Sequence, residues 1–271
     1  MTTTQLKIVS LNIASSFRDE ATNPLHKRLD AINLLFKNIY DNICSFDMLC
    51  IQEVRASGSY TSMELIIEIY NMLRNINPLI NWEFNTQFTN ADIKSFRRVI
   101  FWNAQKYSLN NSSSVYIPNK KEPLFDYMIA VHQFTHQGKT NPRFRVMNVH
   151  APLRIEEKQE YWKTTTRMID EDQVIIIGDM NKFETEQEIF QNILSSSSNN
   201  EMHDLISPDI KTFYSFDSDL KPDGITHYES SLDSVIVHKS DICEVEIVST
   251  KDLNPRPTDH FCIIAKWNIL E

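Results

Sequence analysis

The clearest structural signal in the chain is Val174-Ile-Ile-Ile-Gly-Asp-Met-Asn181, where four β-branched residues run into a carboxylate and an amide. Val and Ile favour extended backbone, and a short apolar run bounded by polar residues is typical of a strand buried on both faces. The segment therefore predicts a core strand over 174–179. The end of that strand would hold Asp179 and Asn181 on a rigid base.

Eight further strand-like runs lie on either side of this segment: Lys7–Ile13, Asp47–Val54, Val99–Trp102, Tyr127–Phe134, Phe144–His150, Leu232–His238, Glu244–Val248 and Phe261–Trp267. Helical spacing of apolar residues appears over 25–43 and 62–73, and the Thr185/Glu188 spacing of a capping box predicts a third helix. Several strands follow one another without a helix between them. This order favours an α/β protein with two stacked mixed sheets covered by helices over a regular βαβ barrel.

Length, composition and charge limit the class of protein. The 271 residues are 41% hydrophobic and 23% charged, which is typical of a globular chain, and we expect a single domain over 1–271. The net charge of −9 disfavours attraction of polyanions by bulk charge. We expect the four cysteines to be reduced thiols in the core. Because the sequence shows no signal-like run and no membrane-spanning run, we expect an intracellular, cytoplasmic protein, and we expect a monomer.

Glycine usage excludes two common nucleotide sites. The chain has four glycines, and none stands in a GxGxxG or GxxxxGK[ST] pattern. A dinucleotide-binding fingerprint and a P-loop are therefore absent from the sequence.

Polar side chains stand where the predicted strands begin or end. The segments are Leu11-Asn12, Gln52-Glu53, Asn148-Val-His150, Gly178-Asp-Met-Asn181, Leu232-Asp233 and Thr258-Asp-His260. Carboxylate and amide oxygens suit Mg²⁺ or Mn²⁺, and histidines supply acid, base or phosphate-polarising groups. This set indicates hydrolysis at phosphorus with Mg²⁺ or Mn²⁺ as cofactor.

Taken in this order, the six segments resemble the endonuclease/exonuclease/phosphatase superfamily, whose best-known members are similar to pancreatic deoxyribonuclease. Single pairs such as Gln-Glu are common by chance, but six in the right order at strand edges are specific. The resemblance covers residues 6–267. It implies a four-layered α/β sandwich, in which two stacked mixed β-sheets are flanked by helices.

The resemblance also implies roles for the strand-end residues. Glu53 would be the principal metal ligand, with Asn12 and Asp259 near the same ion. Asp179 would orient or deprotonate the attacking water, and Asn181 would hold that water and a phosphate oxygen. Asp233 would fix the tautomer of His260, and His150 would donate a hydrogen bond or a proton as the phosphorane forms; these would be the catalytic residues.

One stretch departs from the family pattern. Pancreatic-type nucleases pair the histidine at the position of His150 with an acidic residue before a middle strand, whereas this chain has Ser95-Phe-Arg-Arg98 there. Arg97 or Arg98 could bind substrate phosphate instead, and the alternative is a solvated basic turn. Phe213-Tyr-Ser-Phe216 could stack a base, because it precedes the Asp233 strand, where family members place a substrate loop.

We therefore predict a divalent-metal-dependent phosphodiesterase, with nucleic acid, DNA or RNA, as the expected substrate. The first alternative keeps the chemistry and changes the substrate to a phospholipid, an inositol phosphate or a phosphotyrosyl adduct of nucleic acid. The second alternative is an inactive family member that serves as a binding module. The loops decide between these substrates.

Overall fold

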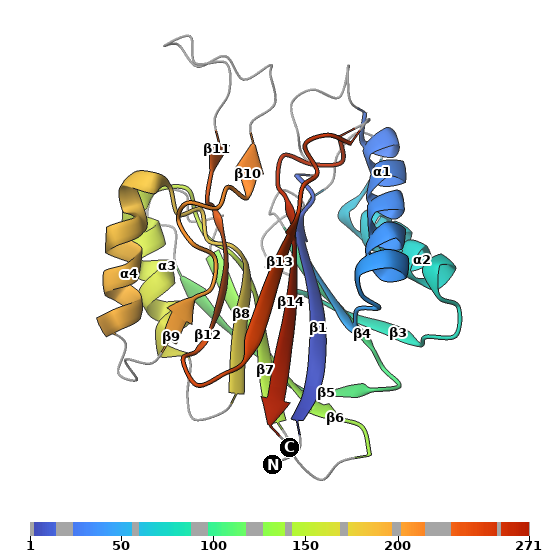
Figure 1. The fold of residues 1–271 in the computed structure, drawn as a ribbon, viewed down its shortest axis with the longest axis horizontal. Helices are drawn as coiled ribbons and strands as arrows, with labels where there is room; N and C mark the ends of the chain where they lie inside the picture. The colour runs from blue at the N-terminus through green and yellow to red at the C-terminus, as the bar shows by residue number, and fades with distance from the viewer. Residues whose placement is uncertain are drawn as a thin grey trace.

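Two six-stranded mixed sheets stack face to face in a computed structural model of the chain (Figure 1). The first sheet has the spatial order β13 (Cys243–Val248), β14 (Cys262–Leu270), β1 (Thr3–Asn12), β2 (Met48–Val54), β4 (Arg97–Asn103) and β3 (Trp82–Gln87). The second has the order β5 (Tyr107–Ile117), β6 (Tyr127–His136), β7 (Arg143–His150), β8 (Gln173–Asp179), β12 (Asp233–His238) and β9 (Met202–Asp204). A separate two-stranded ribbon pairs β10 (Phe213–Tyr214) with β11 (Glu229–Ser230).

The structure describes residues 3–14, 24–55, 60–87, 97–117, 127–138, 143–168, 173–196, 202–214, 229–253 and 256–270. Every one of the nine predicted strands is present within these ranges. The strands β3, β5, β9, β10 and β11 were not predicted.

Helices cover the outer face of each sheet, so the protein has four layers (Figure 1). The first sheet is covered by α1 (Leu25–Asn38), which continues as a π-helical turn over Ile39–Ile43, and by α2 (Ser62–Ile76). The second is covered by α3 (Ile155–Arg167) and α4 (Gln187–Ser196), which follows a short 3-10 turn over Glu184–Glu186. The four-layered sandwich predicted from the family resemblance is therefore confirmed.

Local chemistry explains where some of these helices begin. Thr61 caps α2, because its Oγ1 accepts from the Glu64 backbone N–H at 3.2 Å while Glu64 accepts from the Thr61 N–H at 2.7 Å. The cap predicted at Thr185 is wrong. Thr185 lies inside the 3-10 turn, and the Glu186 carboxylate instead accepts from the Phe183 N–H at 3.1 Å.

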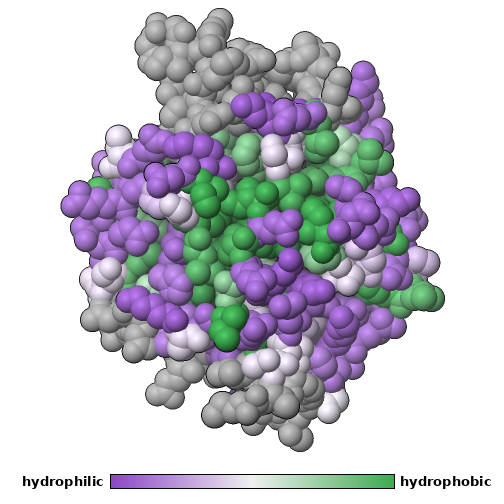
Figure 2. All heavy atoms as spheres, in the orientation of Figure 1, coloured by the Kyte–Doolittle hydropathy of each residue, from purple (hydrophilic) through white to green (hydrophobic). Residues whose placement is uncertain are grey.

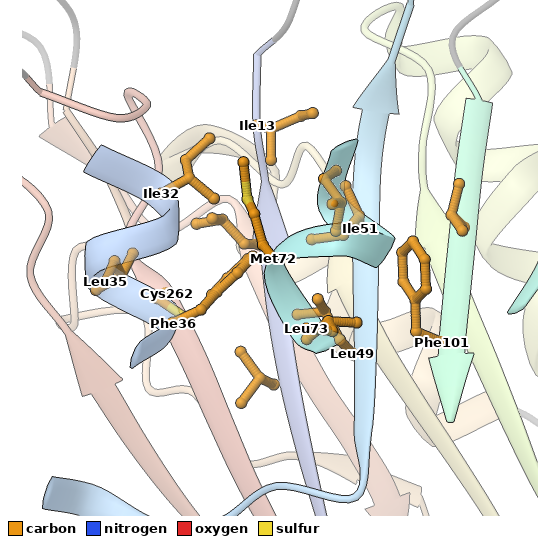
Figure 3. Packing of buried hydrophobic residues seen from close by; sticks show 14 of the residues in the cluster. Ile13, Ile32, Leu35, Phe36, Leu49, Ile51, Met72, Leu73, Phe101 and Cys262 are labelled. Carbon is orange, nitrogen blue, oxygen red and sulfur yellow. The ribbon is translucent and has the colours of Figure 1, made fainter. Parts of the chain in front are cut away.

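Three apolar layers separate the four structural layers. Figure 3 shows the outer layer of the first sheet, where Ile32, Phe36 and Met72 of the helices meet Leu49, Ile51 and Phe101 of the strands. A second cluster fills the space between the sheets, and a third joins the second sheet to α3 and α4. The strands β1, β2, β7 and β8 contribute buried side chains to apolar clusters on both of their faces, so their ends are held rigidly.

Three of the four cysteines lie in the core, as predicted. All four are free, and Cys44, Cys50 and Cys262 are buried, whereas Cys243 is only half-buried. Figure 2 shows apolar residues gathered over the middle of the viewed face. The half-buried side chains of Val245 and Ile247 in β13 pack against the core between the sheets. Among the described residues, no helix is both long and apolar enough to cross a bilayer.

Candidate active site

The polar strand ends identified in the sequence meet at one end of the sandwich. In the first sheet, β1 and β2 run parallel, with Asn12 beside Gln52. In the second sheet, β7 and β8 run parallel, with His150 beside Asp179, and Asp233 of β12 is also paired with Asp179. Parallel neighbours bring their carboxyl ends to one edge, so both sheets deliver functional groups to the same place.

Backbone strain is concentrated at this edge. The non-glycine residues with positive φ are Ala14 at 43°, Glu53 at 56° and Asn181 at 49° among those described. Such conformations cost about 1–3 kcal/mol each and persist where the surrounding structure holds them. The pairing of β2 with β4 shifts register between Ile51 and Val54, and this bulge turns Glu53 out of the strand pattern.

Glu53, His150 and Asp179 form the centre of the site. The Nε2 atom of His150 lies 3.4 Å from Oε1 of Glu53 and 3.7 Å from Oδ2 of Asp179. One donor atom from each residue lies within 4.8 Å of the others, which is a spacing that one metal ion can bridge. Burial opposes ionisation of Glu53, but hydrogen bonds from His150 and Asn12 and the histidine charges outweigh it and lower its pKa to about 2.

His260 approaches the same centre from the other side. Its Nδ1 lies 3.0 Å from Oδ2 of Asp233, while its Nε2 lies 3.7 Å from Oδ2 of Asp179 and 3.9 Å from Oδ1 of Asp259. Burial disfavours the imidazolium, but the charges of Asp233, Asp179 and Asp259 and the hydrogen bond to Asp233 hold the pKa of His260 well above its usual value. His260 is therefore placed to carry a proton that faces Asp179.

Asn12 joins the carboxylates of the two sheets. Its Nδ2 donates to Oε1 of Glu53 at 2.9 Å and to Oδ2 of Asp179 at 3.0 Å, while its Oδ1 accepts from the Ala14 N–H at 3.0 Å. As a metal ligand, Asn12 would use its Oδ1 atom, which accepts a hydrogen bond from the Ala14 N–H here. Its assignment as a ligand stays a prediction.

Asp259 lies at the rim. Burial raises its pKa to about 6, with the Glu53 charge adding to this effect and His260 opposing it. The side chains of Glu53, His150 and Asp259 keep 20%, 16% and 14% of their surface exposed, whereas Asp179 and Asp233 keep 2% and 3%. A substrate would therefore meet the first three groups directly.

Asn181 supports Asp179 through its backbone. Its N–H donates to Oδ1 of Asp179 at 2.8 Å, and its own Nδ2 donates to the Ala151 carbonyl at 2.7 Å. Burial raises the pKa of Asp179, and the His260 charge opposes this rise. A carboxylate of raised proton affinity suits the water-activating role predicted for Asp179.

A buried polar network ties the two sheets together beneath the site. Gln52 of the first sheet donates to Oδ1 of Asn148 in the second at 2.6 Å. Asn148 in turn donates to the carbonyls of Ile51 and Val99 at 3.1 and 2.9 Å. Gly178 leaves room for this network, because a Cβ there would lie 2.4 Å from the Val149 carbonyl oxygen and 3.0 Å from Nε2 of Gln52.

The two predicted phosphate-binding arginines are placed differently. Arg97 opens β4, and its side chain lies outside the described part of the chain. Arg98 is only 6% exposed, and its Nη1 donates to the Tyr161 hydroxyl at 2.9 Å. Phosphate binding by Arg98 stays a prediction that this burial disfavours.

Phe213 reaches the site, whereas Ser215 and Phe216 of the same predicted segment lie outside the described residues. The Phe213 and His260 ring centroids are 5.1 Å apart at an interplanar angle of 67°. Phe213 therefore packs edge-on against the catalytic candidate His260.

Sequence reasoning missed the inward face of α3, formed by Lys158, Tyr161 and Trp162. All three side chains are buried and contact the ends of β7 and β8. Helical spacing from 158 to 162 was a possible signal, but a lysine and a tyrosine at buried positions conceal an apolar stripe.

No protein-family model and no curated protein sequence matches the chain. Among solved structures, an endonuclease/exonuclease/phosphatase from Bacteroides vulgatus superposes with a TM-score of 0.72 at 14% identity, covering 98% of this chain and 100% of its own. A mannosyl-6-phosphatase from Bacteroides thetaiotaomicron gives 0.66 at 16% identity, covering 97% and 99%. TDP2 from D. rerio, complexed with a single-strand DNA product, gives 0.67 at 13% identity, covering 98% and 99%.

Proposed function

We propose that this chain, which has the endonuclease/exonuclease/phosphatase fold, is a divalent-metal-dependent phosphoesterase. One observation carries the proposal: donor atoms of Glu53, His150 and Asp179, from both sheets, converge within 4.8 Å beside the His260–Asp233 pair. Structural neighbours that share the fold include a mannosyl-6-phosphatase and TDP2. Their identities to this chain, 16% and 13%, support the fold and leave the substrate to be determined.

The donor set fits Mg²⁺ or Mn²⁺. Glu53 is ionised at neutral pH because its pKa is about 2, and it presents a partly exposed carboxylate. Asp179 and Asp259 add oxygen donors, and with Asn12 as the fourth candidate the site is rich in hard ligands. A bound ion would supply positive charge against the negative charge that develops on the phosphate oxygens.

The chain's own groups would then carry the proton transfers. Asp179, held by the Asn181 N–H, would orient a water molecule and accept its proton. His260, kept protonated by Asp233, would donate a hydrogen bond to a phosphoryl oxygen. His150, 16% exposed beside Glu53, would donate to the phosphate or to the leaving oxygen.

We propose nucleic acid as the substrate and the phosphodiester as the bond that is cleaved. The neighbour complexed with a single-strand DNA product supports this choice. The net charge of −9 means that phosphate must be attracted locally, by the metal and by His150 and His260. Phe213, packed on His260, offers an aromatic ring on which a base could stack.

A substrate panel tests the function. Supercoiled plasmid, single-stranded DNA, RNA, a 5′-tyrosyl oligonucleotide, sphingomyelin, inositol polyphosphates and a sugar phosphate would be incubated with the protein and Mg²⁺ or Mn²⁺. Cleavage of DNA or RNA supports the nuclease, and cleavage of another class keeps the phosphoesterase but replaces its substrate. No cleavage of any class, with nucleic-acid binding retained, indicates a binding module.

We also propose that residues 1–271 form one domain. Both sheets contribute to the site, and the Gln52–Asn148 hydrogen bond joins them. A single cooperative unfolding transition, the same by circular dichroism and by tryptophan fluorescence, is expected. Two separated transitions would contradict the single domain.

A further inference from the structure

One face of α3 holds the backbone at the ends of both β7 and β8. Lys158, Tyr161 and Trp162 form this face, which we call the α3 anchor face, and all three are fully buried. Trp162 Nε1 donates to the Met180 carbonyl at 3.1 Å, and the Tyr161 hydroxyl is hydrogen-bonded to the His150 backbone. Positions three and four residues apart share a helix face, so one helix can serve both strand ends.

Lys158 makes the contact closest to the proposed chemistry. Its Nζ donates to the Asn181 carbonyl at 2.7 Å and to Oε2 of Glu186 at 2.5 Å, and lies 4.2 Å from the centroid of the Phe183 ring. Glu186 also accepts from the Phe183 N–H at 3.1 Å. A buried ammonium is costly unless it is paired, and these contacts supply the pairing.

The backbone at Asn181 needs such a partner. β8 ends at Asp179, and Asn181 then turns into the left-handed region at φ 49°, so the carbonyls of Met180 and Asn181 leave the sheet ladder. Buried carbonyls require hydrogen bonds, and here the donors come from Trp162 and Lys158. The N–H of the same Asn181 donates to Asp179.

We infer that Lys158 is a positioning residue for the proposed reaction: by binding the Asn181 carbonyl it fixes the backbone conformation of Asn181, the residue whose N–H orients the Asp179 carboxylate. The inference rests on the proposed function, because Asp179 is the group that would activate water. Lys158 does not reach the substrate. It acts through Asn181 on the direction of one catalytic carboxylate.

A second buried ion pair provides a matched control. Lys182 is also fully buried and is paired with Asp204, which accepts in addition from the Ser234 hydroxyl at 3.0 Å and from the Val235 N–H at 3.2 Å. These partners belong to β9 and β12, whereas the Asn181 carbonyl accepts from Lys158. Loss of this pair should lower stability without releasing the peptide that orients Asp179.

The experiment compares two double variants, Lys158→Met/Glu186→Gln and Lys182→Met/Asp204→Asn. Each removes one buried ion pair without leaving an unpaired charge. Hydrogen exchange of the peptide containing residues 179–183 reports on the backbone, and kcat and KM on the best panel substrate report on the chemistry. The thermal midpoint measures the general loss of stability in both.

For the Lys158 pair we expect faster exchange over 179–183 and a fall in kcat on the order of 10²-fold with KM little changed, because misplacement near 1 Å costs that much. For the Lys182 pair we expect a comparable fall in thermal midpoint with near-normal kcat and exchange. Equal effects of the two variants, or normal exchange and kcat in the Lys158 variant, would overturn the inference.

Two further arms keep the test decisive. Glu186→Gln alone leaves the bond from Lys158 to Asn181, so it should retain most of kcat. A fall in kcat on the order of 10²-fold in this single variant would contradict the assignment, whether or not the double variant folds. If the wild-type protein cleaves no panel substrate, the proposed function fails, while the exchange measurement still tests whether Lys158 holds the Asn181 peptide.

Discussion

His260 and Asp233 form a directed pair, in which Nδ1 of the imidazole lies 3.0 Å from Oδ2 of the carboxylate and Nε2 points toward Asp179. Asp233 therefore fixes which nitrogen faces the reaction. The two residues come from opposite sheets, since Asp233 begins β12 and His260 precedes β14. The pair exists only when the sandwich is assembled.

Asp233→Asn should lower kcat far more than it raises KM, because the neutral amide no longer stabilises the imidazolium that faces the phosphate. His260→Ala should cost at least as much, on the order of 10² to 10⁴ in rate. The Asp233→Asn/His260→Ala double variant should be little slower than His260→Ala, since the two residues act as a unit. Steady-state kinetics of the three variants checks this, and multiplying losses would show that the residues act independently.

His132, which is not one of the candidate active-site residues, should make the free energy of unfolding depend on pH. It is fully buried, with Nδ1 3.1 Å from the Ser112 hydroxyl, and burial together with the Arg98 charge lowers its pKa from 6.5 to about 4. Between these values the unfolded chain binds a proton that the folded chain does not. Stability is therefore complete above about pH 6.5 and falls by roughly 3 kcal/mol as the pH drops to about 4.

Urea unfolding of the wild type and of His132→Gln over this pH range measures the effect. Other groups titrate in both proteins, so the difference between their slopes isolates His132. The wild type should lose more unfolding free energy on acidification. Parallel slopes would mean that His132 titrates normally in the folded protein.

Gly178→Ala should destabilise the protein severely, by at least about 2 kcal/mol, because the new methyl group overlaps the Val149 carbonyl. The φ of +132° adds backbone strain for any residue with a Cβ. Gly138→Ala is the control, since it also has positive φ, +79°, but meets nothing within 4 Å. It should cost only about 1 kcal/mol. Similar losses at both glycines would refute the close approach of β7 and β8.

Arg98→Gln should reduce stability rather than substrate affinity. Loss of the bond to the Tyr161 hydroxyl removes support from the His150 backbone and should cost about 1–3 kcal/mol of unfolding free energy. KM should stay close to that of the wild type. A raised KM at unchanged stability would restore direct phosphate binding by Arg98.

Much of the fold was predictable because its core strands are dense in Val and Ile and end in polar residues. The apolar run over 174–179 located β8. The six polar segments at the predicted strand ends located the site. The strand β5 was missed, because Tyr107–Ile117 contains Asn and four serines and its outer residues are exposed, so it lacks an apolar run. Short strands such as β9 owe their conformation to their partners, and three residues give no pattern.

The supporting residues of the site were harder to predict than its polar groups. Helix α3 buries Lys158, Tyr161, Trp162 and Thr165 in place of aliphatic residues, so its inward face looks polar in the sequence. Arg98 looked like a surface cation and is instead buried against Tyr161. Charged side chains are rarely buried without partners, and the partners are distant in the sequence.

The central claim is that Glu53, His150 and Asp179, the centre of the site, form a metal-dependent hydrolytic centre. Its most direct test is the hydrolysis rate of the best panel substrate by chelator-treated protein as Mg²⁺ is titrated back, measured for the wild type and for Glu53→Gln. The wild type should be inactive in chelator and recover with Mg²⁺ or Mn²⁺, while Glu53→Gln, folded to the same thermal midpoint within a few degrees, should recover at least about 10²-fold less activity, because several kcal/mol of transition-state stabilisation are lost. Full activity in excess chelator, or wild-type recovery by Glu53→Gln, would contradict the account.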